Sequence, residues 1–562
     1  MMRAVLPVLL SLSVMTATGA VAQSAPPVQI PGSVEPGRPT VPAPLEEQRR
    51  APKAQLQFSI PTQRKGAAPS AGGDLRFPLK RIAVEGATVF DPATLFADKI
   101  TELTSRPVTL AEVAGLADAI QARYLALGLG LTRAFVPAQE IKDGSITIRV
   151  IEGHLARVRV EGGGAGDRER VEGRLADALA ARPAQVGLIE RGLLLVDDLP
   201  GVTVTGLIRP GDEFGAAELL VGLDRAPYAM VAGVGNRGSD FAGPWSGFVD
   251  LAANGFLGWG EQIGVTLSAT PEVDEQRSAN LRWQQPLAAS GLSLTSTGNY
   301  SRGRPGAALK PFAVATESVG VGQRLSWPVI RSRARNLTLE AGWNLQHATV
   351  EILNAPFSRD DWRTLDVRAT YSGQHIAGGD LFATAGITRG LGILGATGKG
   401  SLEGSRPGTD ADFTKLSGEI GYGLRLPAGL GATLTLAGQY SPDVLPAGEE
   451  FALGGTRFGR GYNGGDLSGP KAIGGGLELR RGFDPGLPFI DAMVPYAFLD
   501  SGRVWDSIAA DTHLLSTGGG LRMGIAGKAS LTMEVARTLR ALPIPGADRR
   551  RTRLFLDLTV QL

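Results

Sequence analysis

Residues 337–346 read LTLEAGWNLQ, a stretch in which every second side chain is apolar. A period of two is typical of a β-strand with one apolar and one polar face. The same alternation recurs at residues 263–269, 531–535 and 554–562, and clusters of Gly, Asn, Asp and Pro separate such runs. Repeated strands of this kind are typical of a transmembrane β-barrel, although a soluble β-sandwich would alternate in the same way.

The length of the alternating region favours the barrel. Residues 226–562 are 337 residues in which the helical period is absent. At roughly 21 residues for each strand with its share of the loops, the region holds about 16 strands, an even number that a single-chain barrel prefers. We therefore predict an antiparallel outer-membrane β-barrel over residues 226–562.

The N-terminus predicts export from the cytoplasm. Arg3 precedes an apolar run at residues 4–14, and Ala20-Val21-Ala22 forms a site of the A-x-A type. This pattern is typical of a secretory signal peptide over residues 1–22, and its apolar run is too short to span a bilayer. The next segment, residues 23–77, carries ten prolines and little apolar periodicity. It is interpreted as a Pro-rich linker, in which only Leu45 to Arg50 has a helical pattern. This patch is a candidate for a short plug helix of the pore, and at about two turns it would need a docking site to be stable.

Residues 78–225 read as two copies of a small α/β fold. In residues 78–152, a strand at 79–84 is followed by a helix that opens with a capping box at Thr109 and Glu112, and then by strands at 131–136 and 145–151. The order β-α-α-β-β begins again after Leu155 and fills residues 153–225. Two tandem domains of one type are the simplest interpretation.

Composition excludes several classes of function. The 562 residues carry a formal charge of +2, so there is no basic field of the kind that binds nucleic acid. The chain has no cysteine, and its four histidines lie singly, without metal-ligand spacing. The glycines of residues 390–395 fit a dinucleotide fingerprint only formally, since no βαβ pattern surrounds them. We expect no metal, nucleotide or other cofactor, and no catalytic residues.

Short motifs along residues 77–562 resemble those of the outer-membrane transporters of two-partner secretion, the haemolysin and filamentous-adhesin exporters. This family lies within the larger superfamily of POTRA-bearing assembly barrels. The motifs of the small domains are Phe77-Pro78-Leu79-Lys80-Arg81-Ile82, Tyr124 with Leu127-Gly128, Val136-Pro137-Ala138-Gln139, Ile151-Glu152-Gly153, Glu190-Arg191-Gly192 and Asp198-Leu199-Pro200-Gly201. Those of the barrel are Asn236-Arg237-Gly238-Ser239, Asn254-Gly255-Phe256-Leu257-Gly258, Arg460-Gly461-Tyr462 and Phe498-Leu499-Asp500-Ser501-Gly502.

The resemblance implies two periplasmic POTRA domains, a barrel of 16 strands and export of one large secreted partner, an adhesin or haemolysin, without nucleotide hydrolysis. It places the protein in the outer membrane of a Gram-negative bacterium, with the lipid bilayer and the barrel-assembly machinery as further partners. The final residue, Leu562, departs from the aromatic residue common in assembly signals. Two alternative functions stay open. The protein could be a factor that assembles other outer-membrane proteins, or it could be a passive porin. A TonB-dependent receptor is a third, but it would need a plug domain that the two repeats do not resemble.

The resemblance also implies a luminal lock. Gly-rich residues 453–476 are too long for a hairpin turn and are expected to fold inward as a loop. Asp500 lies on an alternating strand, where a lipid-facing carboxylate would be costly, so its side chain is expected in the lumen. In the family the loop arginine pairs with this aspartate. The residues of the predicted lock are Arg460, Gly461, Tyr462, Phe498, Asp500 and Gly502.

A second predicted site is a groove in the first POTRA domain. An unfolded client can add a strand to the free edge of a sheet, because backbone hydrogen bonds give affinity without demanding one sequence. We expect this groove between the strand at 131–136 and the helix at 109–127. Its predicted residues are Tyr124, Leu127, Phe135 and Val136.

Overall fold

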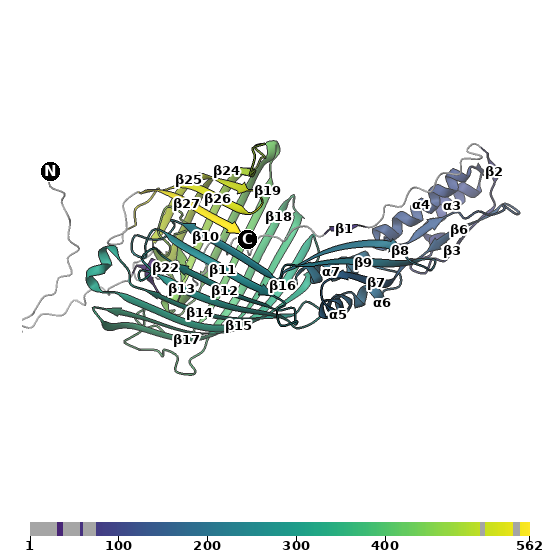
Figure 1. Cartoon of the computed structure of the whole chain (residues 1–562). Helices are drawn as coiled ribbons and strands as arrows, with labels where there is room; N and C mark the ends of the chain where they lie inside the picture. Colours follow the sequence, from purple (N-terminus) through teal and green to yellow (C-terminus); the bar gives the residue numbers. More distant parts are fainter. Residues whose placement is uncertain (1–30, 38–56, 60–74, 506–511, 543–550) are drawn as a thin grey trace, which may run out of the picture.

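The computed structural model describes residues 31–37, 57–59, 75–505, 512–542 and 551–562. The predicted signal peptide and the helical patch at residues 45–50 lie outside these ranges. Figure 1 shows a barrel at one end of the molecule and two small α/β domains in line with it at the other end. No helix within the described residues is long and apolar enough to cross a membrane.

Sixteen antiparallel strands close the barrel, as the alternating sequence predicts. In chain order they are β10 (Tyr228–Gly235), β11 (Ser246–Asn254), β12 (Gln262–Ala269), β13 (Arg277–Pro286), β14 (Ser293–Gly303), β15 (Ala315–Arg331), β16 (Arg335–Ile352), β17 (Ala355–Ile376), β18 (Gly379–Gly390), β19 (Thr414–Arg425), β20 (Leu430–Tyr440), β23 (Lys471–Arg481), β24 (Ile490–Trp505), β25 (Thr512–Ile525), β26 (Ala529–Thr538) and β27 (Thr552–Gln561). Closure pairs the backbone groups of both terminal strands, so the wall has no open edge in the bilayer.

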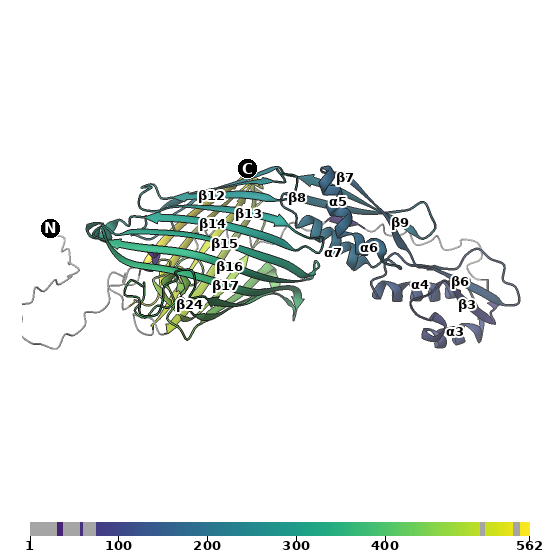
Figure 2. The ribbon, with the colours of Figure 1, turned by 90° about the horizontal axis from the view of Figure 1, so that it is seen from below.

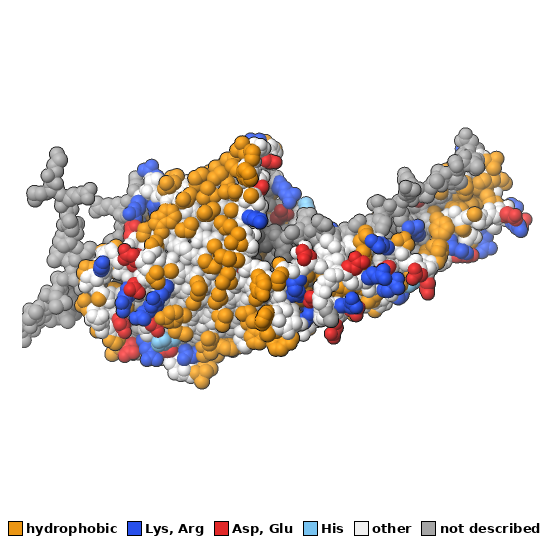
Figure 3. Space-filling view, in the orientation of Figure 1, with side chains coloured by type: hydrophobic (Ala, Val, Ile, Leu, Met, Phe, Trp, Pro, Cys, Tyr) orange, Lys and Arg blue, Asp and Glu red, His pale blue; other side chains and the backbone are white. Residues whose placement is uncertain are grey.

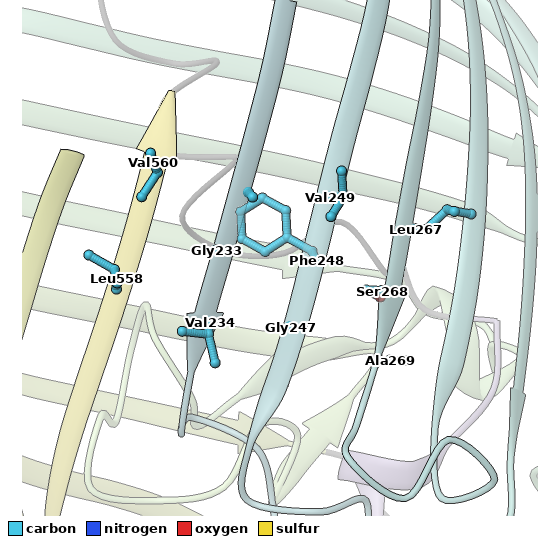
Figure 4. Close-up of a pocket in the computed structure, with 11 residues that line it drawn as sticks. Gly233, Val234, Gly247, Phe248, Val249, Leu267, Ser268, Ala269, Leu558 and Val560 are labelled. Atoms are coloured by element: carbon cyan, nitrogen blue, oxygen red, sulfur yellow. The ribbon is translucent and has the colours of Figure 1, made fainter. Parts of the chain in front are cut away.

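The barrel closes at a seam between β10 and β27, which is its shortest pairing. Five residue pairs join these strands, against eight between β10 and β11. The motif residue Asn236 extends the seam, because its side chain accepts a hydrogen bond from the Leu556 amide and donates one to the Leu554 carbonyl. Beside the seam, the outer wall carries a shallow apolar hollow lined by exposed side chains such as Val234 and Leu267 (Figure 4). On the luminal face of the same strands, the ring of Phe248 lies against Gly233.

The two faces of the wall differ as a membrane barrel requires. Exposed apolar side chains such as Leu281 and Trp283 share one face of β13, and the space-filling view shows apolar side chains across the visible face of the barrel (Figure 3). Polar and charged side chains, including the buried Asp250 and Asp500, occupy the opposite, luminal face. Alternation therefore sorts lipid-facing from lumen-facing residues.

The first small domain has the predicted order. Its elements are β2 (Phe77–Pro78), β3 (Arg81–Glu85), α2 (Pro92–Leu95), α3 (Ala97–Thr104), β4 (Pro107–Val108), α4 (Leu110–Ala126), β5 (Arg133–Phe135) and β6 (Ser145–Ile151). The predicted capping box is present, since Glu112 N–H donates to Thr109 and the Glu112 carboxylate accepts from Thr109 N–H. A three-stranded sheet in the order β3-β6-β5 packs on α4, which leaves β5 at an edge.

The second small domain repeats the first with longer strands. It contains β7 (His154–Gly162), α5 (Ala165–Arg174), α6 (Ala176–Ala180), α7 (Val186–Asp197), β8 (Val202–Pro210) and β9 (Ala216–Arg225). A short N-terminal strand, β1 (Gln57–Ser59), pairs in parallel with β8 and widens the sheet to the order β1-β8-β9-β7. The linker expected over residues 23–77 therefore contributes a strand, which its low apolar content did not predict.

The second domain is fastened to the barrel through two of the sequence motifs. The Asp198 carboxylate accepts two hydrogen bonds of 2.8 Å from the Arg331 guanidinium on β15. Glu190 on α7 accepts from the backbone and side chain of Arg333, and Arg191 donates to the carbonyls at the end of β15. Figure 2 shows the helices of this domain against the ends of the barrel strands.

Candidate functional site

The connection between β20 and β23, residues 441–470, folds into the lumen. It contains a small hairpin, β21 (Phe451–Leu453) and β22 (Leu467–Gly469), and is named here the inner loop. Leu453, Phe458 and Tyr462 of the loop pack with Val504 and Leu514 of the wall in a small apolar core. The loop was expected to extend to residue 476, but residues 471–476 belong to strand β23 because they pair with β20 and β24.

Arg460 of the inner loop meets Asp500 of β24. The Arg460 backbone N–H and Nε both donate to Asp500 Oδ2, at 3.2 and 3.1 Å, and Nη2 donates to Oδ1 at 3.4 Å. The side chain of Asp500 is 0% exposed and that of Arg460 is 11% exposed. The geometry is a bidentate charge-assisted pair inside protein, the arrangement for which a guanidinium fork is suited.

Two further carboxylates surround Arg460, and sequence analysis did not identify them. Arg460 Nη1 lies 3.2 Å from Glu478 Oε2 on β23 and 3.3 Å from Glu534 Oε2 on β26. The guanidinium also lies 3.7 Å from the centroid of the Phe498 ring, which is a close cation–π contact. The available signal was a lone carboxylate on the polar face of each alternating strand, a place where lipid contact is avoided.

The neighbours of Arg460 fix the loop by close approach. A Cβ on Gly461 would lie 2.8 Å from the Thr538 nitrogen of β26, and a Cβ on Gly502 would lie 2.7 Å from the Leu453 side chain. The Tyr462 hydroxyl donates to the Arg540 carbonyl at 2.6 Å and accepts from the Leu515 amide at 3.3 Å. The Arg-Gly-Tyr sequence therefore places one charge, one close backbone contact and one hydroxyl against the wall.

A second arginine connects this site to the seam. Arg237, which follows β10, donates from Nη1 to Glu534 Oε1 at 2.9 Å and from Nε to Asp557 Oδ2 of β27 at 2.6 Å. The other oxygen of Glu534 accepts from Arg460 and from the Tyr496 hydroxyl. One carboxylate is therefore shared between the inner loop and the strand that closes the barrel.

The N-terminal residues 31–37 lie in the lumen near the end of the barrel that faces away from the small domains (Figure 1). Arg406 is buried between Glu35 of this segment and Glu450 of the inner loop. Gly37 packs on the indole of Trp362, whose nitrogen donates to Glu449 at 2.8 Å. The linker interpretation is wrong for residues 31–37, because ion pairing and aromatic packing stabilise a segment that has little apolar content.

Three of the four predicted groove residues in the first domain are at least partly exposed, and the fourth is buried. Strand β5 lies at the sheet edge beside α4, with Phe135 and Val136 partly buried and Leu127 exposed at the end of the helix. Tyr124 is fully buried, so its assignment to the groove surface is wrong. Its hydroxyl donates to Glu152 at 2.5 Å. Burial alone would raise the pKa of Glu152, but hydrogen bonds from Thr88 and Tyr124 hold it below the usual value.

Side-chain amides cover the edge of this sheet. Gln121 of α4 accepts a hydrogen bond from the Ala134 N–H, which points away from the sheet. Beyond the end of β5, Gln139 accepts from the Thr147 N–H at 2.8 Å and donates to the Thr147 carbonyl at 2.7 Å. The amide of Gln139 thus pairs with β6 as a neighbouring strand would. Such covers protect an exposed edge from indiscriminate pairing.

Comparison with known families gives two matches. Residues 220–525, more than half of the chain, match the family described as haemolysin secretion/activation protein ShlB/FhaC/HecB. Residues 77–153 match the POTRA domain of ShlB type. The first match covers most of the barrel, and the second covers the domain that contains β5.

Similar proteins match this chain over two thirds of its length or more. Heme/hemopexin transporter protein HuxB of Haemophilus influenzae (strain 86-028NP) is 22% identical over 524 residues, which cover 88% of this chain and 90% of that protein. Outer membrane transporter CdiB-2 of Burkholderia pseudomallei (strain 1026b) is 26% identical over 418 residues, or 70% and 67% of the two chains. The structure of CdiB from Escherichia coli has a TM-score of 0.69 at 20% identity and covers 89% of this chain and 93% of that one.

We predict that Arg406→Gln raises the single-channel conductance in planar bilayers. The substitution leaves Glu35 and Glu450 without their shared cation, and two neighbouring carboxylates then repel each other in a buried site. Segment 31–37 should leave the lumen in a larger fraction of molecules, and the open area should grow.

Arg389→Gln is the matched control. Arg389 pairs with Asp412 at an exposed position on β18, where both partners are about half exposed. An exposed pair contributes at most ~1 kcal/mol, so this variant should conduct as the unmodified protein does. Equal conductance of all three proteins would show that Arg406 does not hold the segment in the lumen.

Proposed function

The chain belongs to the haemolysin secretion/activation protein family, and from this premise we propose that it recognises one dedicated secreted protein through its first POTRA domain and releases its inner loop to export that protein. It is an outer-membrane export pore of two-partner secretion. Relatives are transporters named for heme/hemopexin and for hemolysin. The partner of this chain is of the same general kind, a large secreted protein that crosses the lumen unfolded.

The observation that carries the proposal is the ion-paired inner loop inside a closed barrel. Arg460 is held by Asp500, Glu478 and Glu534 from three strands of the wall. The N-terminal segment is tied to the same loop through Arg406 and Glu450. A protein chain can pass only if both pieces move, so the lock sets the resting state and export requires its release and re-formation.

The orientation follows from the proposed path. The two POTRA domains lie in the periplasm, where an exported and still unfolded client first meets the protein, and the barrel-assembly machinery inserts the barrel. The client pairs with β5 after Gln121 leaves the Ala134 N–H. The second domain, fixed to β15 by the Asp198 and Arg331 pair, keeps this edge in line with the lumen.

Substitutions in the lock should reduce export unequally. Asp500 is fully buried, so breaking its pair with Arg460 costs about 3–5 kcal/mol rather than the ~1 kcal/mol of an exposed pair. That corresponds to roughly two to four decades in the population of the docked loop. We expect Asp500→Ala to reduce export strongly and Arg460→Ala to reduce it further, because the latter leaves three carboxylates without their cation.

The measurement is the amount of partner protein secreted by cells in which each variant reaches the outer membrane in equal amount. The double variant should export as poorly as Arg460→Ala alone, because residues in contact are not additive. Defects that simply add would contradict a joint role for the two residues.

The edge strand generates a second prediction. Phe135→Asp places a charge beside the position of an added strand and should weaken binding of a labelled, unfolded partner fragment to the full-length protein by at least about tenfold. Fluorescence anisotropy in detergent gives the affinity. Gln121→Ala should tighten binding several-fold, since it frees the Ala134 N–H.

Two controls separate contact from stability. Leu95→Asp changes an exposed apolar residue on α2, which packs beside β3 at the opposite edge of the sheet, and should leave binding unchanged. Tyr124→Phe removes a buried hydrogen bond and should lower the unfolding free energy by about 1–3 kcal/mol with no change in affinity. Undiminished binding to a folded Phe135→Asp protein would overturn the assignment of β5.

A further inference from the structure

Two arginines face each other on the outer wall of the barrel. Arg277 of β13 is the direct cross-strand partner of Arg302 of β14. Arg277 shares its face of β13 with the exposed Leu281 and Trp283, so both guanidinium groups lie on the lipid side of the wall. Their side chains are 43% and 39% exposed. Like charges directly opposite on neighbouring strands are destabilising unless a counter-charge is present.

The pair lies one membrane thickness from the POTRA end. The turn between β13 and β14 meets the second POTRA domain, because a Cβ on Gly291 would touch Leu195 of α7. From that end, at Pro286, strand β13 runs nine residues to Arg277. Nine residues span about 31 Å along a strand. With the usual tilt this gives roughly 23–25 Å along the membrane normal, which is the height of the apolar band of such barrels.

Neighbouring residues indicate the same depth in the membrane for the two arginines. Tyr300 of β14, two residues before Arg302 on the same face, stands where an aromatic girdle meets the lipid head groups. In Figure 3 the charged side chains gather at the end of the barrel away from the POTRA domains, and the apolar band ends there. The two arginines are therefore at the head-group level of the leaflet that faces away from the periplasm.

A third arginine, Arg304, lines a small hollow together with Arg277 and Arg302. Asp274, Arg277, Arg302 and Arg304 surround a space of about 70 Å³. Two carboxylates form long ion pairs with them, Asp274 at 3.7 Å from Arg277 and Glu317 at 4.0 Å from Arg302, and neither pair is at hydrogen-bond distance. The residues around this space carry three positive charges and one negative charge, and arginine side chains can bind a tetrahedral oxyanion through paired N–H donors.

We propose that Arg277, Arg302 and Arg304 bind a phosphate of an outer-leaflet lipid. A lipid is the source rather than free phosphate, because Arg277 and Arg302 stand on the lipid-facing side at the end of the apolar wall, where a membrane-anchored phosphate is held at high local concentration. Acyl chains of such a lipid would lie along Ala279 and Leu281 below the arginines. The inference rests on the proposed orientation, with the POTRA domains in the periplasm.

The experiment uses the full chain in detergent and native mass spectrometry. The probe is lipid A that carries its two phosphates, and the comparison lipid is the same lipid A after enzymatic removal of the phosphates. We expect the unmodified protein to retain the phosphorylated lipid and the variant Arg277→Gln/Arg302→Gln to bind it roughly 30-fold more weakly, at about fivefold for each arginine near a membrane surface. Arg277→Lys/Arg302→Lys should recover part of the affinity, since charge remains but paired donors are lost.

Arg481→Gln is the matched control, because Arg481 is an exposed arginine at the end of β23 and pairs there with Leu430. It should bind the lipid as the unmodified protein does. Equal retention of the dephosphorylated lipid would overturn the proposal, because acyl chains alone would then hold it. Displacement by millimolar inorganic phosphate with no retention of lipid would also overturn it, since the site would then take the free anion.

Secretion by the same variants separates this inference from the proposed function. Loss of lipid binding with normal export would leave the export role intact. If the proposed export function were wrong, the amount of lipid that the protein retains would be unchanged.

Discussion

Every backbone group in the wall must find its partner within the wall, because the bilayer offers none. Sixteen strands satisfy this condition only by closing on themselves, and β10 and β27 do so through five residue pairs. A barrel of this size encloses a lumen too wide for its own side chains to fill. The inner loop and residues 31–37 occupy the space that closure creates.

Segments that fill a polar lumen are held by charge rather than by an apolar core. Arg460 is surrounded by carboxylates from β23, β24 and β26, and Arg406 lies between Glu35 and Glu450. Buried ion pairs are costly to assemble, yet they define one arrangement sharply because any misplaced partner leaves a charge uncompensated. Such pairs suit pieces that must stay in place at rest and also be able to leave.

The site around Arg460 is connected to the seam of the barrel through Arg237. Glu534 accepts from Arg460 with one oxygen and from Arg237 with the other, and Arg237 continues to Asp557 on β27. The docked loop and the seam therefore share one carboxylate. Of the two described pieces of the N-terminal region, β1 pairs with β8 of the second POTRA domain, and residues 31–37 pair with the inside of the barrel.

Much of the architecture could be predicted from local patterns alone. The alternation of residues 337–346 predicts the barrel, and the capping box at Thr109 predicts the start of α4, because both depend on neighbours in the sequence. Arg460 and Asp500 could be named only through their motifs. The contact between them joins residues forty positions apart and forms only when the loop folds inward.

Other features were decided by tertiary structure. The partners of Glu478, Glu534 and Arg406 could not be predicted from local patterns, because they come from distant strands and loops. The sequence motifs predict Tyr124 in a surface groove, but packing of α4 on the sheet buries it. Residues 31–37 looked like linker because ordering by ion pairs leaves no periodic trace in a sequence. The sequence by itself therefore determined the strands and their two faces, whereas only closure of the barrel decided which charges meet inside it, since those contacts join residues that are remote along the chain.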